Sequence, residues 1–126
     1  MVVNTARYML FCFAYVFAAG VTAQILIAGM AIFSDADYWY SHIVFVRALE
    51  FVPIAMLVFS VLGKCANGMR WRSALLFLLV LAQYFTANVP GAGAVHPILA
   101  AVLFWLSIST ARNAGKLVFA GRPRKR

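Results

Sequence analysis

Four long apolar runs, separated by short polar segments, form the pattern of the whole chain. Each run is close to the length of about 20 residues with which a helix crosses a hydrocarbon core of roughly 30 Å. None alternates with the period of two that barrel strands need, and helices satisfy all their backbone polar groups within lipid. The sequence predicts an all-α membrane protein, a four-transmembrane-helix bundle in one domain over residues 1–126. The expected helices span about 8–33, 41–62, 73–89 and 97–117.

The segments between the runs carry the signals that end helices. Residues 34–42, SDADYWYSH, are acidic and aromatic, and such rings prefer the headgroup level of a membrane. Residues 63–72 contain two glycines as helix breakers and several cations. A break rich in Pro and Gly, residues 88–93, comes before the last run, and Pro97 suits the first turn of a helix. Residues 118–126 form a basic C-terminal tail.

Composition and charge agree with a membrane as the solvent. The chain is 65% hydrophobic and only 11% charged, whereas soluble domains carry about 25% charged residues. The formal net charge is +8, and its cations gather near the N-terminus, in residues 63–72 and near the C-terminus, while Asp35 and Asp37 lie in the first connection. The positive-inside rule predicts a multi-pass protein of the inner (cytoplasmic) membrane with both termini cytoplasmic. Terminal cations of this kind are expected to meet membrane lipid and no nucleic acid.

A short motif occurs twice and indicates an internal repeat. The pattern V-x-A-Q-x-x-x-A surrounds Gln24 and again Gln83, and a histidine follows each copy, His42 and His96. We interpret this as two repeated helical hairpins related by a pseudo-two-fold axis along the membrane normal. The predicted topology then puts both histidines near the outer face, each at the start of a helix.

The two histidines are the first candidates for chemistry. Neutral imidazole binds haem iron well, and four-helix bundles hold cofactors between facing helices. Placed at one depth on two helices, His42 and His96 could supply both axial ligands of a haem b. The alternative is that each caps a helix at the interface and contacts water or headgroups. Zinc is not expected, because no third Cys, Asp or Glu lies near them in the pattern.

Gln24 and Gln83 are amides inside apolar runs, where a side chain of this kind needs a partner. One interpretation is that they hydrogen-bond between helices and hold the bundle together. The functional alternative is that they face a central cofactor or a quinone, or that they orient the histidines.

Arg47 and Glu50 are the charged residues deepest within an apolar run. They are three residues apart, so they share a helix face and can pair. Ionisable residues at membrane depth are candidates for function. Arg47 is a candidate partner for a haem propionate, and Glu50 is a candidate for a proton path, while the alternative is a structural ion pair. Pro53 is predicted to kink this helix and to free the carbonyl near Leu49.

The motifs resemble those of DUF6220, an uncharacterised family of bacterial four-helix membrane proteins. The resemblance rests on Gln24-x-x-x-Ala28-Gly29, His42, Gln83-x-x-x-Ala87 and His96-Pro97. The closing stretch HPILAAVLFWLSISTARNA is its closest part. The resemblance implies a four-helix membrane fold and names no activity. This architecture is similar to one half of haem A synthase and to other haem-b four-helix proteins, where histidines near the outer face bind haem.

Three functions agree with the sequence. The first is a haem b-binding electron-transfer protein that exchanges electrons with a quinone or a membrane redox partner. The second is a non-enzymatic membrane subunit or assembly factor, and the third is a small proton-coupled transporter that uses Glu50. The sequence contains no nucleophile elbow, phosphate loop or HExxH motif, so catalytic residues are not assigned. Small residues at 18–20 would allow a homodimer.

Overall fold

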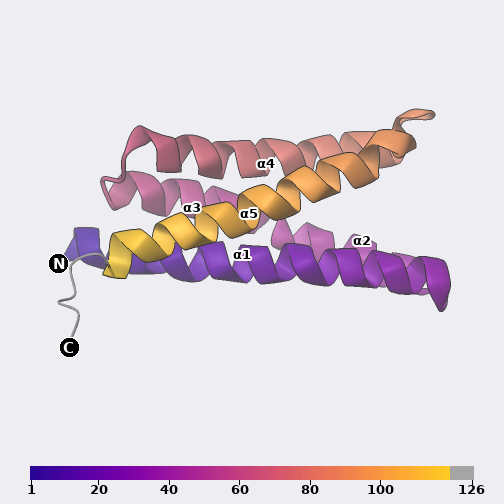
Figure 1. Cartoon of the computed structure of the whole chain (residues 1–126), viewed down its shortest axis with the longest axis horizontal. Coiled ribbons are helices and arrows are strands. Elements are labelled where there is room, and N and C mark those ends of the chain that lie inside the picture. The colour runs from indigo at the N-terminus through magenta and orange to yellow at the C-terminus, as the bar shows by residue number, and fades with distance from the viewer. Residues whose placement is uncertain (120–126) are drawn as a thin grey trace.

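The chain folds into long helices that run side by side, as the computed structural model of residues 1–119 describes them (Figure 1). These residues contain no strand, which confirms the predicted all-α class. The elements are α1 (Val2–Phe33), α2 (Tyr38–Leu49), α3 (Phe51–Leu62), α4 (Asn67–Asn88), the short 3-10 helix η1 (Ala92–Val95) and α5 (His96–Phe119).

The helices extend beyond the apolar runs from which they were predicted. α1 begins six residues before the expected range of 8–33, and α4 begins six residues before 73–89. The reason is that helical backbone hydrogen bonds continue through polar residues, which a search for apolar runs excludes. Likewise α5 ends at Phe119, so the first two residues of the predicted tail are helical. The remainder of that tail lies outside the described residues.

The second predicted helix is divided into α2 and α3 at Glu50, three residues before Pro53. Proline has no N–H, so the carbonyl of Leu49 has no helical partner there, and the ring crowds that same turn. The predicted kink near Leu49 is therefore confirmed. Glu50 itself keeps right-handed backbone angles, with φ −60° and ψ −26°, so the path bends without reversing.

Three helical segments are long and apolar enough to cross a membrane: Val2–Phe33, Tyr38–Leu62 and Ala92–Phe119. This agrees with a membrane protein. The fourth expected span, α4, falls short of the same criteria. Its first turns carry two arginines, and Gln83 and Asn88 interrupt its other end.

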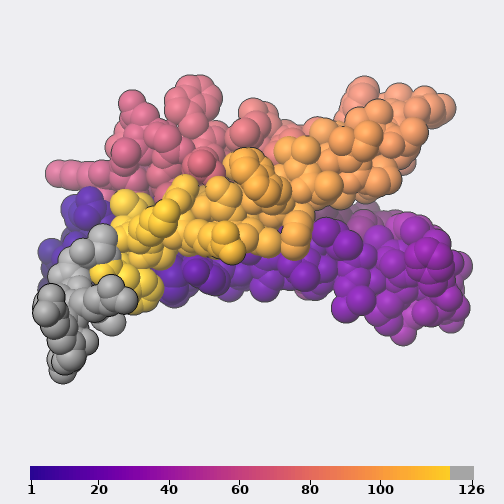
Figure 2. Space-filling view, viewed as in Figure 1, coloured from indigo at the N-terminus to yellow at the C-terminus, as the bar shows by residue number. Residues whose placement is uncertain are grey.

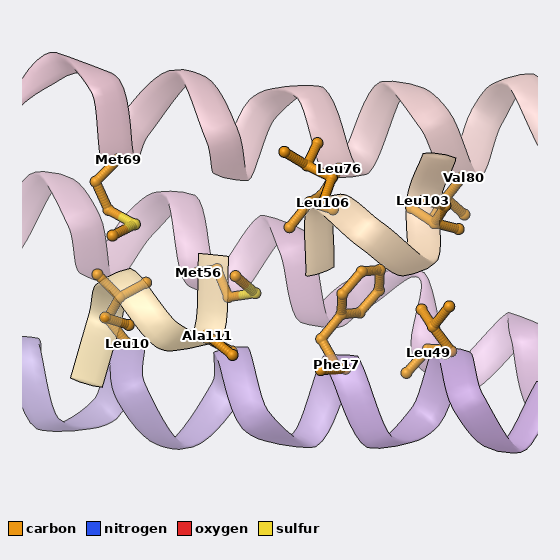
Figure 3. Close-up of a cluster of buried hydrophobic side chains, with 14 of the residues drawn as sticks. Leu10, Phe17, Leu49, Met56, Met69, Leu76, Val80, Leu103, Leu106 and Ala111 are labelled. Atoms are coloured by element: carbon orange, nitrogen blue, oxygen red, sulfur yellow. The ribbon is translucent and has the colours of Figure 1, made fainter. Parts of the chain in front are cut away.

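The bundle buries an apolar core together with several small and hydroxyl side chains, while many other large apolar side chains are exposed. Helix α1 packs against α2, α3 and α5, while α4 packs against α3 and α5. Figure 3 shows the apolar core between these helices, with Phe17 and Leu10 of α1 facing Met56, Leu76 and neighbours. Four hydroxyl groups are also fully buried, and each donates to a carbonyl of its own helix. They belong to Ser60, Ser73, Ser107 and Thr110.

Gly20 allows α1 to approach the bend between α2 and α3 closely. A Cβ atom built on Gly20 would collide with the side chain of Leu49, which is buried at the end of α2. Gly29, nine residues further along α1, has no atom within 4 Å of such a Cβ. The two glycines therefore give a matched pair for testing the contact.

We predict that Gly20→Val destabilises the bundle and that Gly29→Val does not. The added methyl groups at position 20 must displace Leu49, and overpacking of this kind costs about 1–3 kcal/mol. Both substitutions introduce the same β-branched residue into α1, so intrinsic helix propensity cancels from the comparison. The measurement is the midpoint of thermal unfolding in detergent, followed by circular dichroism.

Leu49→Ala in the Gly20→Val background should recover part of the lost stability, because it makes room for the valine. Equal midpoints for Gly20→Val and Gly29→Val would show that the contact between Gly20 and Leu49 does not constrain the packing.

Candidate functional site

The two helical hairpins separate at the end of the bundle that is far from the N-terminus. There α2 packs only against α1 and α3, whereas α4, η1 and α5 pack against one another. Figure 1 shows the α1–α2 pair and the α4–α5 pair diverging, and Figure 2 shows a notch between them at that end. We call this opening the hairpin notch. Helix α2, which contains His42, and the start of α5, which is His96, lie at this end of the bundle.

His42 lies in the second turn of α2, four residues after the helix begins, whereas the sequence placed it at the helix start. Gln24 of α1 donates from Nε2 to the backbone oxygen of His42 at 3.0 Å. Two buried polar atoms here have no hydrogen-bond partner among the described residues: Nδ1 of His42 and Oε1 of Gln24. The ring of His42 also meets the edge of the Trp39 ring, with centroids 5.7 Å apart.

His96 opens α5, as predicted, and its ring is held from α4. Thr86 Oγ1 lies 3.1 Å from His96 Nδ1, and the Thr86 hydroxyl proton can go to the carbonyl of Ala82 or Gln83. Which of the two groups donates in the contact between Thr86 and His96 depends on which ring nitrogen of His96 carries the proton.

Gln83 occupies the same position toward His96 that Gln24 occupies toward His42. With its amide oriented so that the oxygen accepts from the Ala100 N–H at 2.7 Å, the nitrogen lies 3.2 Å from the His96 carbonyl oxygen. The same nitrogen is 2.8 Å from His96 Nδ1. In both hairpins a buried glutamine therefore donates to the backbone carbonyl of the histidine that follows it.

The imidazoles of His42 and His96 come from different hairpins, and only a weak electrostatic interaction links them. No hydrogen bond joins them within the part of the chain that the structure describes. Neither belongs to a group of three or more His, Cys, Asp or Glu side chains among these residues.

Glu50 and Arg47 do not form an ion pair with each other in residues 1–119. Glu50 sits at the break between α2 and α3 and is half-buried, whereas Arg47 is exposed. The buried hydroxyl of Tyr84 faces the Glu50 carboxylate and lies within electrostatic reach of Arg47, without a hydrogen bond of standard geometry. Glu50, just after the end of α2, thus lies toward Tyr84 of α4.

Sequence reasoning missed Thr86 and Tyr84. A signal for Thr86 was present, because it lies three residues after Gln83 and so on the same face of α4. Tyr84 had no such signal, since a tyrosine in an apolar run is typical of ordinary packing. Its position opposite Glu50 follows only from the way α3 and α4 pack.

A family model decides where the chain belongs. The family of unknown function DUF6220 matches residues 24–89, just over half of the chain. The chain belongs to this family. The DUF6220 match contains Gln24, His42 and Gln83, whereas His96 and the closing stretch that looked closest to the family lie outside it. No curated protein and no solved structure matches the chain.

The two glutamines of this DUF6220 member should differ in what they contribute to stability. Gln83→Leu removes the hydrogen bonds of both amide atoms and leaves the Ala100 N–H and the His96 carbonyl without that partner. We therefore expect the free energy of unfolding to fall by about 1–2 kcal/mol. Gln24→Leu removes one hydrogen bond but also an unpaired buried oxygen, so we expect a change near zero. Thermal unfolding in detergent measures both variants. An equal loss for both would contradict the difference in their surroundings.

Proposed function

We propose that the protein binds one haem b at the hairpin notch, with His42 and His96 as axial ligands, and transfers electrons to a quinone or a membrane redox partner. The observation that carries the proposal is that the imidazole of His42 keeps a buried nitrogen, Nδ1, without a hydrogen-bond partner among the described residues. A buried polar atom of this kind costs about 1–3 kcal/mol unless something satisfies it.

The residues around the histidines fit a haem. Thr86 and Gln83 hold the ring of His96, and Gln24 holds the backbone of His42, as supporting groups do for metal ligands. Arg47 is exposed on α2, one turn and a half beyond His42, so it is the candidate to neutralise a propionate. When bound, the haem would supply one-electron chemistry. The protein residues would bind and orient it, and the apolar helices around the notch would restrict access of water.

We further propose that the two hairpins are a duplication. The shared V-x-A-Q-x-x-x-A motif is supported by the equivalent hydrogen bonds from Gln24 to His42 and from Gln83 to His96. Two unrelated hairpins would not be expected to place the same amide on the same carbonyl. The duplication explains why each hairpin offers one imidazole to the notch.

We also propose that all four long helices cross the bacterial inner membrane with both termini in the cytoplasm. Arg7 of α1 donates from Nε to the Gly63 carbonyl at 2.9 Å, so the N-terminal end lies beside the connection between α3 and α4. That connection and the ends of α1 and α5 carry the cations, while Asp35 and Asp37 lie at the opposite end (Figure 1). This separation is the pattern that the positive-inside rule describes.

The test is a visible spectrum of the detergent-purified protein, expressed with a haem precursor, in the oxidised and the dithionite-reduced state. We expect a Soret band and sharp reduced α and β bands at about one haem per chain. His42→Ala and His96→Ala should each abolish the Soret band, because each removes an axial ligand. Glu50→Gln is the control, because it changes a neighbouring buried group without touching a ligand, and it should leave the spectrum unchanged.

A colourless protein, under conditions that load a control cytochrome, would overturn the haem proposal. The two histidines would then be interfacial residues, and the second function, a non-enzymatic membrane subunit or assembly factor, would take precedence. Loss of proton-coupled flux in Glu50→Gln without any spectral change would instead favour the transporter.

A further inference from the structure

The other end of the bundle has a groove between α1 and α5 that the proposed function does not use. Its volume is about 920 Å³. Two aromatic residues of α1, Phe11 and Tyr15, form one wall, and one face of α5 forms the other. Gly115 lies buried between the walls, and a Cβ atom built on it would meet Phe11 and Tyr15 at ordinary contact distances.

The character of the groove changes along α5 from apolar to cationic. Trp105 and Ile108 line one part, and Arg112 and Lys116 line the part nearer the helix end. Arg112 lies seven residues after Trp105, which is about 10 Å along a helix. The two cations are four residues apart and so share one face of α5. A ligand that fills the groove must therefore be apolar at one end and anionic at the other.

The protein itself offers no carboxylate side chain to these cations. The sequence contains only three acidic residues, Asp35, Asp37 and Glu50, and none lies at this end. Arg112 and Lys116 are both exposed. A third cation lies close by, because Arg72 of α4 donates to the Ser109 hydroxyl, which also lines the groove, at 3.0 Å.

Tyr15 adds a hydrogen-bonding group at the cationic level. Its hydroxyl would lie 3.7 Å from a Cβ built on Gly115, which places that hydroxyl between the positions of Arg112 and Lys116 along α5. Its ring packs against Phe11 with centroids 4.8 Å apart. The wall formed by α1 therefore has an apolar surface, made by the two rings, and a polar end, the Tyr15 hydroxyl. This combination suits the level at which acyl chains meet headgroups.

We propose that this groove binds an anionic phospholipid, with the phosphodiester at Arg112 and Lys116 and an acyl chain along Trp105, Ile108 and Phe11. Cations next to a membrane helix attract anionic headgroups. A free phosphate would satisfy the cations but would leave the apolar part of the groove unused. A zwitterionic lipid would bring its own cation next to Arg112 and Lys116, so it should bind more weakly.

The test uses the full-length protein, delipidated in detergent and then mixed with phosphatidylglycerol or with phosphatidylcholine of the same acyl chains. Native mass spectrometry counts the lipid bound per chain. We expect retention of one phosphatidylglycerol and little phosphatidylcholine. Lys116→Gln should weaken phosphatidylglycerol binding about fivefold and the double variant Arg112→Gln/Lys116→Gln about 25-fold.

Lys64→Gln is the matched control, because Lys64 is exposed in the connection between α3 and α4 and does not line the groove. It removes the same charge at the same end of the bundle and should leave binding unchanged. Equal weakening by Lys64→Gln and Lys116→Gln would mean that attraction is diffuse, and it would overturn the proposal. Equal retention of the two lipids, or unchanged binding in the double variant, would do the same.

Glycerophosphoglycerol, the same headgroup without acyl chains, separates a lipid site from a site for a free phosphodiester. We expect no displacement of phosphatidylglycerol at concentrations where the intact lipid competes. Displacement at equal concentration would show that the apolar wall contributes nothing, and the lipid assignment would be wrong. Neither the visible spectrum nor the histidine variants bear on these outcomes.

Discussion

The bend at Glu50 is the feature on which the rest of the arrangement depends. Pro53 leaves the carbonyl of Leu49 without a helical partner, and the helix divides there into α2 and α3. On one side of the bend, α2 packs along α1 and does not pack against α4 or α5. On the other side, α3 packs against both α1 and α4. A straight helix would keep one set of neighbours along its whole length. The bend therefore separates a closed half of the bundle from the half that contains the hairpin notch.

The close contact between Gly20 and Leu49 stabilises this geometry at its centre. In lipid, helices gain little from burying apolar groups, so close packing and interhelical hydrogen bonds hold them together. Small side chains on α1 and hydroxyls that bond within their own helices let the backbones approach. Large apolar side chains remain on the outside, where lipid solvates them, among them Trp105, Phe85 and Ile98.

Polar chemistry is divided between the two ends of the molecule. At the notch, Gln24, Gln83 and Thr86 contact the two histidines, and Nδ1 of His42 and Oε1 of Gln24 are buried without a partner among the described residues. At the opposite end, Arg112 and Lys116 have no acidic side chain nearby among the described residues.

The sequence by itself determined the all-helical class and the approximate positions of the long helices. Apolar runs of membrane length predict helices, because lipid leaves backbone groups no other partner, and Pro53 predicts the bend because it lacks a donor. The motif that surrounds Gln24 and again Gln83 also drew attention to His42 and His96, because a histidine follows each copy. Helix ends were missed at α1 and α4, since polar residues continue a helix without extending the apolar pattern.

Only the tertiary structure decided which of these residues meet. Arg47 and Glu50 share a helix and looked like a pair, yet Glu50 faces Tyr84, because the packing of α3 on α4 brings that hydroxyl closer. Thr86 became a partner of His96 through the turn at η1, and the groove at Arg112 arose from the crossing of α1 and α5. Contacts between helices depend on their rotation and tilt, and a pattern of apolar positions read from one helix at a time does not contain them.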